Sequence, residues 1–111
     1  MITIEDVLND GHVVLDLEAT SKNAAIDELL TTLHGDIRVL SWEKLRAAIH
    51  DREAAAFESN GHGIIIAHGR TDSVATLVMA AGRCAEGFET PGISGKVRLV
   101  FVAGIPTAFS N

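Results

Sequence analysis

The chain has 111 residues, of which 47% are hydrophobic, so it is long enough for one domain with a buried core, residues 1–111. Its formal charge of −6 argues against general affinity for nucleic acid or anionic membranes, which requires clustered lysine and arginine. With a single cysteine, an acidic start and no apolar run near the ~20 residues of a membrane helix, we expect a cytoplasmic protein without membrane insertion.

Hydrophobic periodicity and capping residues predict the elements in chain order. The first third contains a short helix beginning near Thr3, a strand at 12–17, and a helix that Thr20 or Ser21 caps and Gly35 ends. Ser41 caps a second long helix. Three β-rich runs follow at 64–68, 74–82 and 97–105, and the Gly- and acid-rich stretch 83–96 is expected to be a surface loop.

The three later strands are apolar on both faces, which is typical of a sheet covered by helices on both sides. The order strand, helix, helix, strand, strand, strand therefore predicts an α/β fold, a three-layer α/β/α sandwich with a mixed sheet. Two long helices are few for covering both faces. We expect the layer of carboxyl-terminal helices to be missing and one face to be thinly covered.

His68 is the main candidate for chemistry, in the stretch GHGIIIAHGR at 61–70. A neutral imidazole is nucleophilic near neutral pH and can accept a phosphoryl group where the surroundings hold the anion. Gly69 allows backbone N–H groups to approach such an anion, and Arg70 can neutralise it. The alternative is an ordinary core strand with polar ends.

Arg52 continues the core-facing stripe of the second long helix, which includes Leu45 and Ile49. A cation at that position either reaches the strand ends, where it could neutralise phosphate, or lies over the sheet edge with its charge in solvent. Spacing alone leaves both alternatives open.

A metal centre is not expected. His62 and His68 would lie about 20 Å apart in an extended strand, too far to share one ion. Cys84 has no base nearby in the sequence, which argues against a catalytic thiol.

The stretch LRAAIHDREAAAFESNGHGIIIAHGR resembles the active-site region of the enzyme IIA domains of the bacterial phosphotransferase system, in the fructose/mannitol class, which includes the nitrogen-regulatory IIA proteins. Arg52-Glu53 and GIIIAHGR match the family's arginine-glutamate pair and its strand GIAIPHG without a gap. The resemblance covers most of the chain.

The resemblance implies that His68 accepts a phosphoryl group from the histidine-containing phosphocarrier protein and that Arg52 lies beside the phosphohistidine. The acceptor would be a IIB domain or a regulatory target protein. Gly69, Arg70 and Ser59 are our candidates for binding the phosphate, and no cofactor is implied.

The sequence also departs from the family pattern. Ala67 replaces the proline before the histidine, and Phe57-Glu58 replaces a Ser-Thr pair, which brings a carboxylate toward the site. The chain ends soon after its last strand. These departures favour a second hypothesis, a IIA-like pseudo-enzyme that binds a regulatory partner without turnover. They also predict self-association through the uncovered sheet surface.

Overall fold

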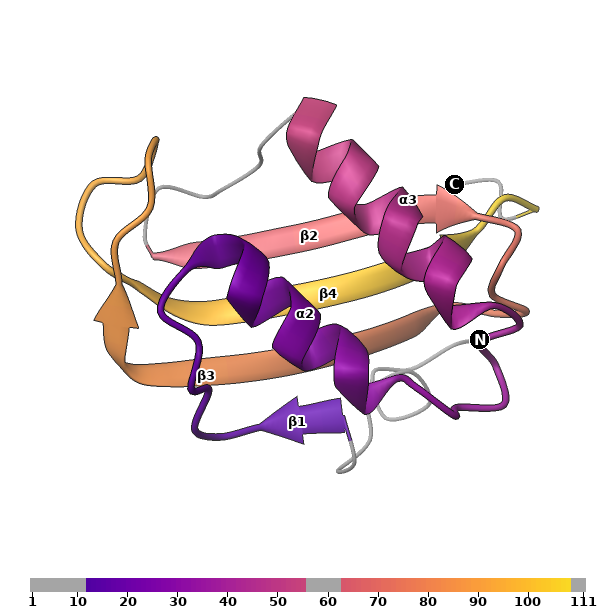
Figure 1. Cartoon of the computed structure of the whole chain (residues 1–111), viewed down its shortest axis with the longest axis horizontal. Coiled ribbons are helices and arrows are strands. Elements are labelled where there is room, and N and C mark those ends of the chain that lie inside the picture. Colours follow the sequence, from indigo (N-terminus) through magenta and orange to yellow (C-terminus); the bar gives the residue numbers. More distant parts are fainter. Residues whose placement is uncertain (1–11, 56–62, 109–111) are drawn as a thin grey trace.

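The computed structural model describes residues 12–55 and 63–108. Its elements are, in order, β1 (Val13–Val14), α2 (Lys22–Thr32), α3 (Trp42–Ala55), β2 (Ile64–Thr71), β3 (Val78–Phe88) and β4 (Val97–Pro106) (Figure 1). This confirms the expected α/β class and element order. The helix expected near Thr3, and also Phe57, Glu58, Ser59 and His62, lie outside the described residues.

The strands form one mixed sheet in the order β1-β3-β4-β2. β2 pairs in parallel with β4, and β3 pairs antiparallel with β4 and parallel with β1. β4 is therefore central, and β2 is an edge strand whose other side has no strand neighbour among the described residues.

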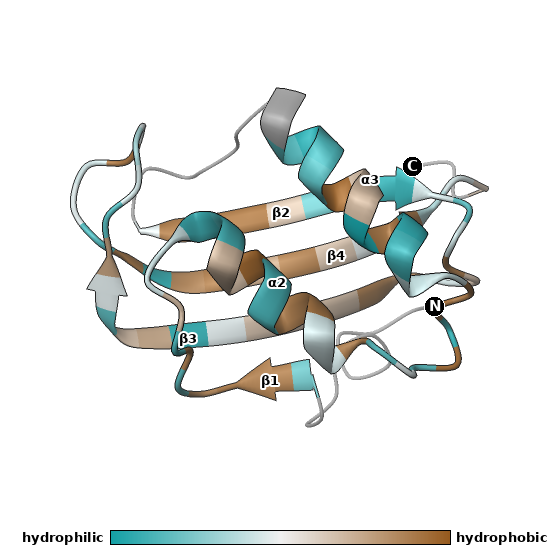
Figure 2. Cartoon of the chain, in the orientation of Figure 1, coloured by the Kyte–Doolittle hydropathy of each residue, from teal (hydrophilic) through white to brown (hydrophobic). Residues whose placement is uncertain are grey.

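Both described helices lie on the same face of the sheet (Figure 1). The buried leucines and isoleucines of the helices pack against alternate residues of the strands. Figure 2 shows this amphipathic pattern as brown strands beneath helices whose outer sides are teal. The fully buried large side chains of this core are Ile26, Leu29, Leu30, Leu33, Leu45, Ile49, Ile65, Val78, Val97, Val100 and Val102.

The opposite face of the sheet has no helix among the described residues. We call it the open face: positions 64, 66, 68 and 70 of β2, positions 99, 101, 103 and 105 of β4, and positions 79, 81 and 83 of β3, which the strand register places side by side. Ile66 is 47% exposed and Leu99 37% exposed, while Phe101 and Ile105 are half-buried.

Serine caps begin both helices, as the sequence predicts. The backbone N–H of Ala24 donates to Ser21 Oγ at 3.3 Å, and that of Lys44 donates to Ser41 Oγ at 3.3 Å. None of the described helices is long and apolar enough to cross a membrane.

Several strand limits differ from the sequence prediction, and the first strand is much shorter than expected, Val13–Val14 instead of 12–17. β2 runs to Thr71 instead of ending at His68, because Arg70 and Thr71 continue the parallel register with β4. β3 begins at Val78 and extends to Phe88, through the start of the expected loop. There the register shifts between Arg83 and Phe88, and Gly87 adopts a positive φ of 76°, so an irregular strand occupies a stretch whose composition resembles a loop.

Candidate functional site

His68 lies within β2, three residues before its end, and pairs in register with Ala103 of β4. Its neighbours Ala67 and Gly69 are buried toward the helices, so the alternation of the strand directs His68 to the open face. The side chain is half-buried, and its Nδ1 atom is inaccessible to solvent. The expectation of a histidine at the end of its strand was therefore wrong, but the histidine does reach an accessible face.

Arg70 shares the open face with His68. Side chains two residues apart on a strand point the same way, with Cα atoms about 6.6 Å apart. Arg70 is exposed, and its guanidinium group is long enough to reach an anion bound at His68.

Gly69 faces the other way, toward α3. A Cβ atom on Gly69 would lie 3.1 Å from the backbone carbon and oxygen of Ala48 and 3.2 Å from the nitrogen of Ile49. Its register partner in β4, Gly104, is similarly close to Leu45, with 2.7 Å between the added Cβ and Cδ1. The pair of glycines lets α3 rest directly on the backbone of β2 and β4.

Arg52 lies on α3 one turn after Ala48, on the side of the helix that packs against β2. It is half-buried, as its place on the core-facing stripe predicts. Arg52 and His68 thus belong to elements in direct contact, but α3 is on the face of the sheet opposite to His68. Among the described residues β2 is an edge strand, with no further strand on its outer side.

The hydroxyl groups that follow the strand are used within the fold. Thr71 Oγ1 and Ser73 Oγ are both buried and lie 2.8 Å apart in a hydrogen bond. The carbonyl of Ser73 accepts from the N–H groups of Leu40 and Ser41, at 2.7 and 3.2 Å. The hydroxyls thus bond to each other inside the fold, while the backbone carbonyl of Ser73 joins this segment to the residues just before α3.

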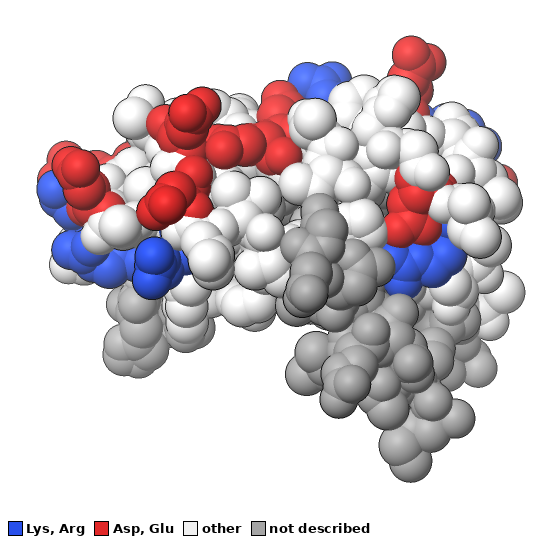
Figure 3. Space-filling view, turned by 90° about the horizontal axis from the view of Figure 1, so that it is seen from below, with Lys and Arg blue, Asp and Glu red and all other residues white. Residues whose placement is uncertain are grey.

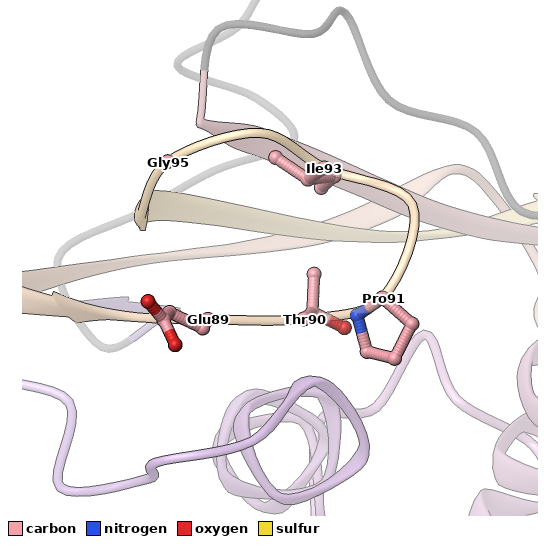
Figure 4. Close-up of a pocket in the computed structure, with 5 residues that line it drawn as sticks. All are labelled: Glu89, Thr90, Pro91, Ile93 and Gly95. Atoms are coloured by element: carbon pink, nitrogen blue, oxygen red, sulfur yellow. The ribbon is translucent and has the colours of Figure 1, made fainter.

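The hollow shown in Figure 4 is separate from His68. It has a volume of about 350 Å³ and is lined by Glu89, Thr90, Pro91, Ile93 and Gly95 of the loop between β3 and β4. That loop lies at the start of β4, whereas Ala103, the partner of His68, lies near its end. Among the described residues, no group of three or more histidine, cysteine or acidic side chains could hold a metal ion.

Acidic side chains gather mainly over the helical layer in the view of Figure 3. Burial raises the pKa of Asp27 on α2, but hydrogen bonds from Arg46 and His50 outweigh that effect and lower it. The Arg38 guanidinium, with help from His12, holds the pKa of Asp36 well below its usual range. In contrast, the open face contains His68, Arg70 and Arg83 and no acidic residue at any of its positions.

The fold matches solved structures of phosphotransferase IIA proteins. The crystal structure of the nitrogen regulatory protein IIA-Ntr from Neisseria meningitidis matches with a TM-score of 0.78 and 30% identity, over 93% of this chain and 70% of that one. IIA mannitol of Escherichia coli, solved in complex with phosphorylated enzyme IIB mannitol, matches with a TM-score of 0.74 and 21% identity, over 92% of this chain and 74% of that one.

The profile of the phosphoenolpyruvate-dependent sugar phosphotransferase system EIIA 2 family matches residues 6–111, so the chain belongs to that family. The fructose-specific EIIABC component of the phosphotransferase system of Bacillus subtilis (strain 168) is 28% identical over 109 residues, 97% of this chain. The chain spans only 17% of that protein's length.

The sequence alone did not reveal the pairing of Gly69 with Gly104 or the open face as one surface. Both depend on the register between strands far apart in the chain. The available signal was that Ile66, Leu99 and Phe101 alternate with the core positions of their strands, but the core positions are equally apolar.

Proposed function

We propose that this chain is a phosphocarrier of a phosphotransferase system and that His68 is the residue that carries the phosphoryl group. The observation that supports this most strongly is a half-buried histidine directed to a sheet face that has no helix among the described residues, in a chain of the EIIA 2 family. The proposed donor is the histidine-containing phosphocarrier protein. The acceptor is a IIB domain or a regulatory target, in the cytoplasm.

In the transfer step, one ring nitrogen of His68 attacks the phosphorus of the donor's phosphohistidine. A new P–N bond forms as the donor's P–N bond breaks and the donor imidazole keeps the electron pair; the His68 ring gives up one proton and the donor ring takes one up, so the exchange balances. Because Nδ1 is shielded from solvent, Nε2 is the acceptor atom that we propose. Passing the group to the next protein reverses these roles.

Positive charge is the main help that this transfer requires, because the transferring group carries negative charge on its oxygens. Arg70, exposed on the same face, and Arg52, by way of the strand edge, are proposed to supply it. Ser59 lies outside the described residues, so its phosphate-binding role stays a prediction. Gly69 takes part by setting the distance between α3 and β2, and any backbone contact with phosphate also remains a prediction.

Transfer of labelled phosphate tests the assignment. Incubation with phosphoenolpyruvate, enzyme I and the histidine phosphocarrier protein is expected to give an acid-labile phosphate on the chain that His68→Ala removes. His34→Ala, which changes an exposed histidine between the two helices, is the matched control and should label like the unchanged chain. Equal labelling of His68→Ala would refute the proposal.

A second candidate function is a IIA-like regulatory module that binds its partner without turnover. The regular pairing of Ala67 through Thr71 with β4 favours this candidate, because it places His68 inside an unbroken strand and not at a strand end. That candidate predicts no labelling by the phosphocarrier protein but retained binding of a IIB domain or regulatory target. Efficient labelling would exclude it.

A further inference from the structure

We propose that Asp27 of α2 is a positioning residue for His68, and that it acts through α3 from the helical side of the sheet. The contacts that carry this inference join α2 to α3 and α3 to β2. The inference rests on the proposed function, because it names a further residue for the same phosphoryl transfer.

Asp27 holds two side chains of α3 with one carboxylate. Arg46 Nε and Nη2 donate to its Oδ1 and Oδ2 atoms at 3.0 and 3.1 Å, a bidentate pair, and Nε2 of His50 lies 2.8 Å from Oδ1. Arg46 and His50 are four residues apart on α3, so they lie on the same side of that helix. We call Asp27, Arg46 and His50 the α2–α3 clamp.

The charge and geometry of the clamp fix the position of one helix relative to the other. Burial alone would raise the pKa of Asp27, but the hydrogen bonds from Arg46 and His50 lower it, so the carboxylate is charged at neutral pH. A bidentate arginine pair sets direction as well as distance, because two parallel N–H groups meet two oxygens. The clamp therefore restricts how far α3 can slide or rotate against α2.

The turn of α3 that the clamp holds is also the turn that rests on β2. Ala48 and Ile49 lie between Arg46 and His50 in the chain, and their backbone atoms are 3.1 and 3.2 Å from the place where a Cβ on Gly69 would lie. Gly69 has no side chain to act as a spacer, so helix and strand are in backbone contact. A shift of α3 is therefore transmitted to β2 at this residue.

His68 is the residue next to Gly69, and its side chain points to the other face of the same strand. A displacement or tilt of β2 at Gly69 therefore changes the direction of the imidazole. Phosphoryl transfer requires the acceptor nitrogen to lie in line with the phosphorus, and a misplacement of about 1 Å can slow such a step by about 100-fold. Because Asp27 lies on the helical side, we expect it to affect the rate of transfer and not the binding of the donor.

The rate of phosphoryl transfer over a series of donor concentrations tests this role. Asp27→Asn should lower the rate at saturating phosphocarrier protein about tenfold and leave the half-saturating concentration unchanged. Asp51→Asn, the same substitution at an exposed position of α3, is the matched control and should transfer like the unchanged chain. Asp27→Glu keeps a carboxylate for Arg46 and should recover most of the rate.

Equal rates for Asp27→Asn and Asp51→Asn would overturn the proposal. A loss of rate that Asp27→Glu does not recover, or that comes with an equally large loss of stability in urea, would overturn it as well, because it would indicate a purely structural role.

The ring signals of His68 in a ¹H–¹⁵N correlation spectrum test the same coupling without phosphate. They should move in Asp27→Asn and stay in place in Asp51→Asn. Signals of His68 that are the same in both variants would contradict a positioning role for Asp27. If the unchanged chain is not labelled by the phosphocarrier protein, only the proposed function fails, and the ring signals still decide whether Asp27 positions His68.

Discussion

His68 and Arg70 show how single residues acquire a role from the direction of their side chains. Both belong to a strand that could be identified from its three consecutive isoleucines, and both face the open side because Ala67 and Gly69 face the helices. Their suitability for accepting and neutralising a phosphoryl group could be predicted from the sequence. Their common direction could not, because alternation assigns a face only once one neighbour is known to be buried.

Replacing Arg70 should slow phosphoryl transfer and leave the stability of the fold nearly unchanged. Arg70→Ala should slow phosphoryl transfer to His68 by about 10- to 100-fold, because it removes a cation next to the developing charge. The side chain is exposed, so the free energy of unfolding should change by less than about 0.5 kcal/mol. Single-turnover labelling and urea denaturation measure the two effects, and an unchanged transfer rate would remove Arg70 from the site.

Replacing Gly69, in contrast, should lower the free energy of unfolding. In Gly69→Ala the new methyl group would meet the backbone of Ala48 and Ile49, which cannot move aside without shifting α3. Overpacking of this kind costs about 1–3 kcal/mol, and urea denaturation beside Arg70→Ala measures it. Equal stability of the two variants would show that α3 does not rest on Gly69.

At the scale of elements, the helices were the most predictable part of the fold. Serine caps and apolar stripes gave both α2 and α3 within a few residues. Strand limits were harder, because pairing partners determine them: β2 extends as far as β4 can pair with it, and β3 continues past Arg83 through an irregular segment. Glycine and acidic residues in that segment resemble a loop until the partner strand is known.

The connection between α2 and α3 depends on a charged cluster near the start of β1. Asp36 accepts hydrogen bonds from Arg38 Nε and Nη2 at 2.9 and 2.7 Å, and it lies 2.7 Å from Nε2 of the buried His12. Asp36→Asn weakens charge-assisted hydrogen bonds, so we expect a loss of about 1–3 kcal/mol of unfolding free energy at neutral pH. Asp72→Asn, at an exposed ion pair with Lys44, is the control and should have little effect.

The cluster also predicts a pH dependence. The pKa of Asp36 is lowered in the folded protein from its ordinary value of 3.8, so its contribution is fully present above that value and is lost as pH falls below it. Denaturation from pH 7 down to about pH 2.5 should therefore show the gap between the unchanged chain and Asp36→Asn narrowing only below about pH 4. A gap that stays constant would contradict the assigned cause.

At the scale of the whole molecule, a sheet with one covered and one open face connects the fold to the proposed function. The core lies between the helices and the sheet, while the histidine and the exposed apolar side chains occupy the other side. The sequence indicated two long helices, but the face of the sheet on which they lie follows from the register.

Phosphoryl transfer to His68 is tested most directly by a ¹H–¹⁵N correlation spectrum of the histidine rings, recorded before and after incubation with the phosphorylated phosphocarrier protein. The expected result is a phosphate on Nε2 of His68, with the ring signals of His34 and His50 unchanged. Unchanged signals for His68, or phosphate on a different histidine, would contradict its role as the phosphoryl carrier.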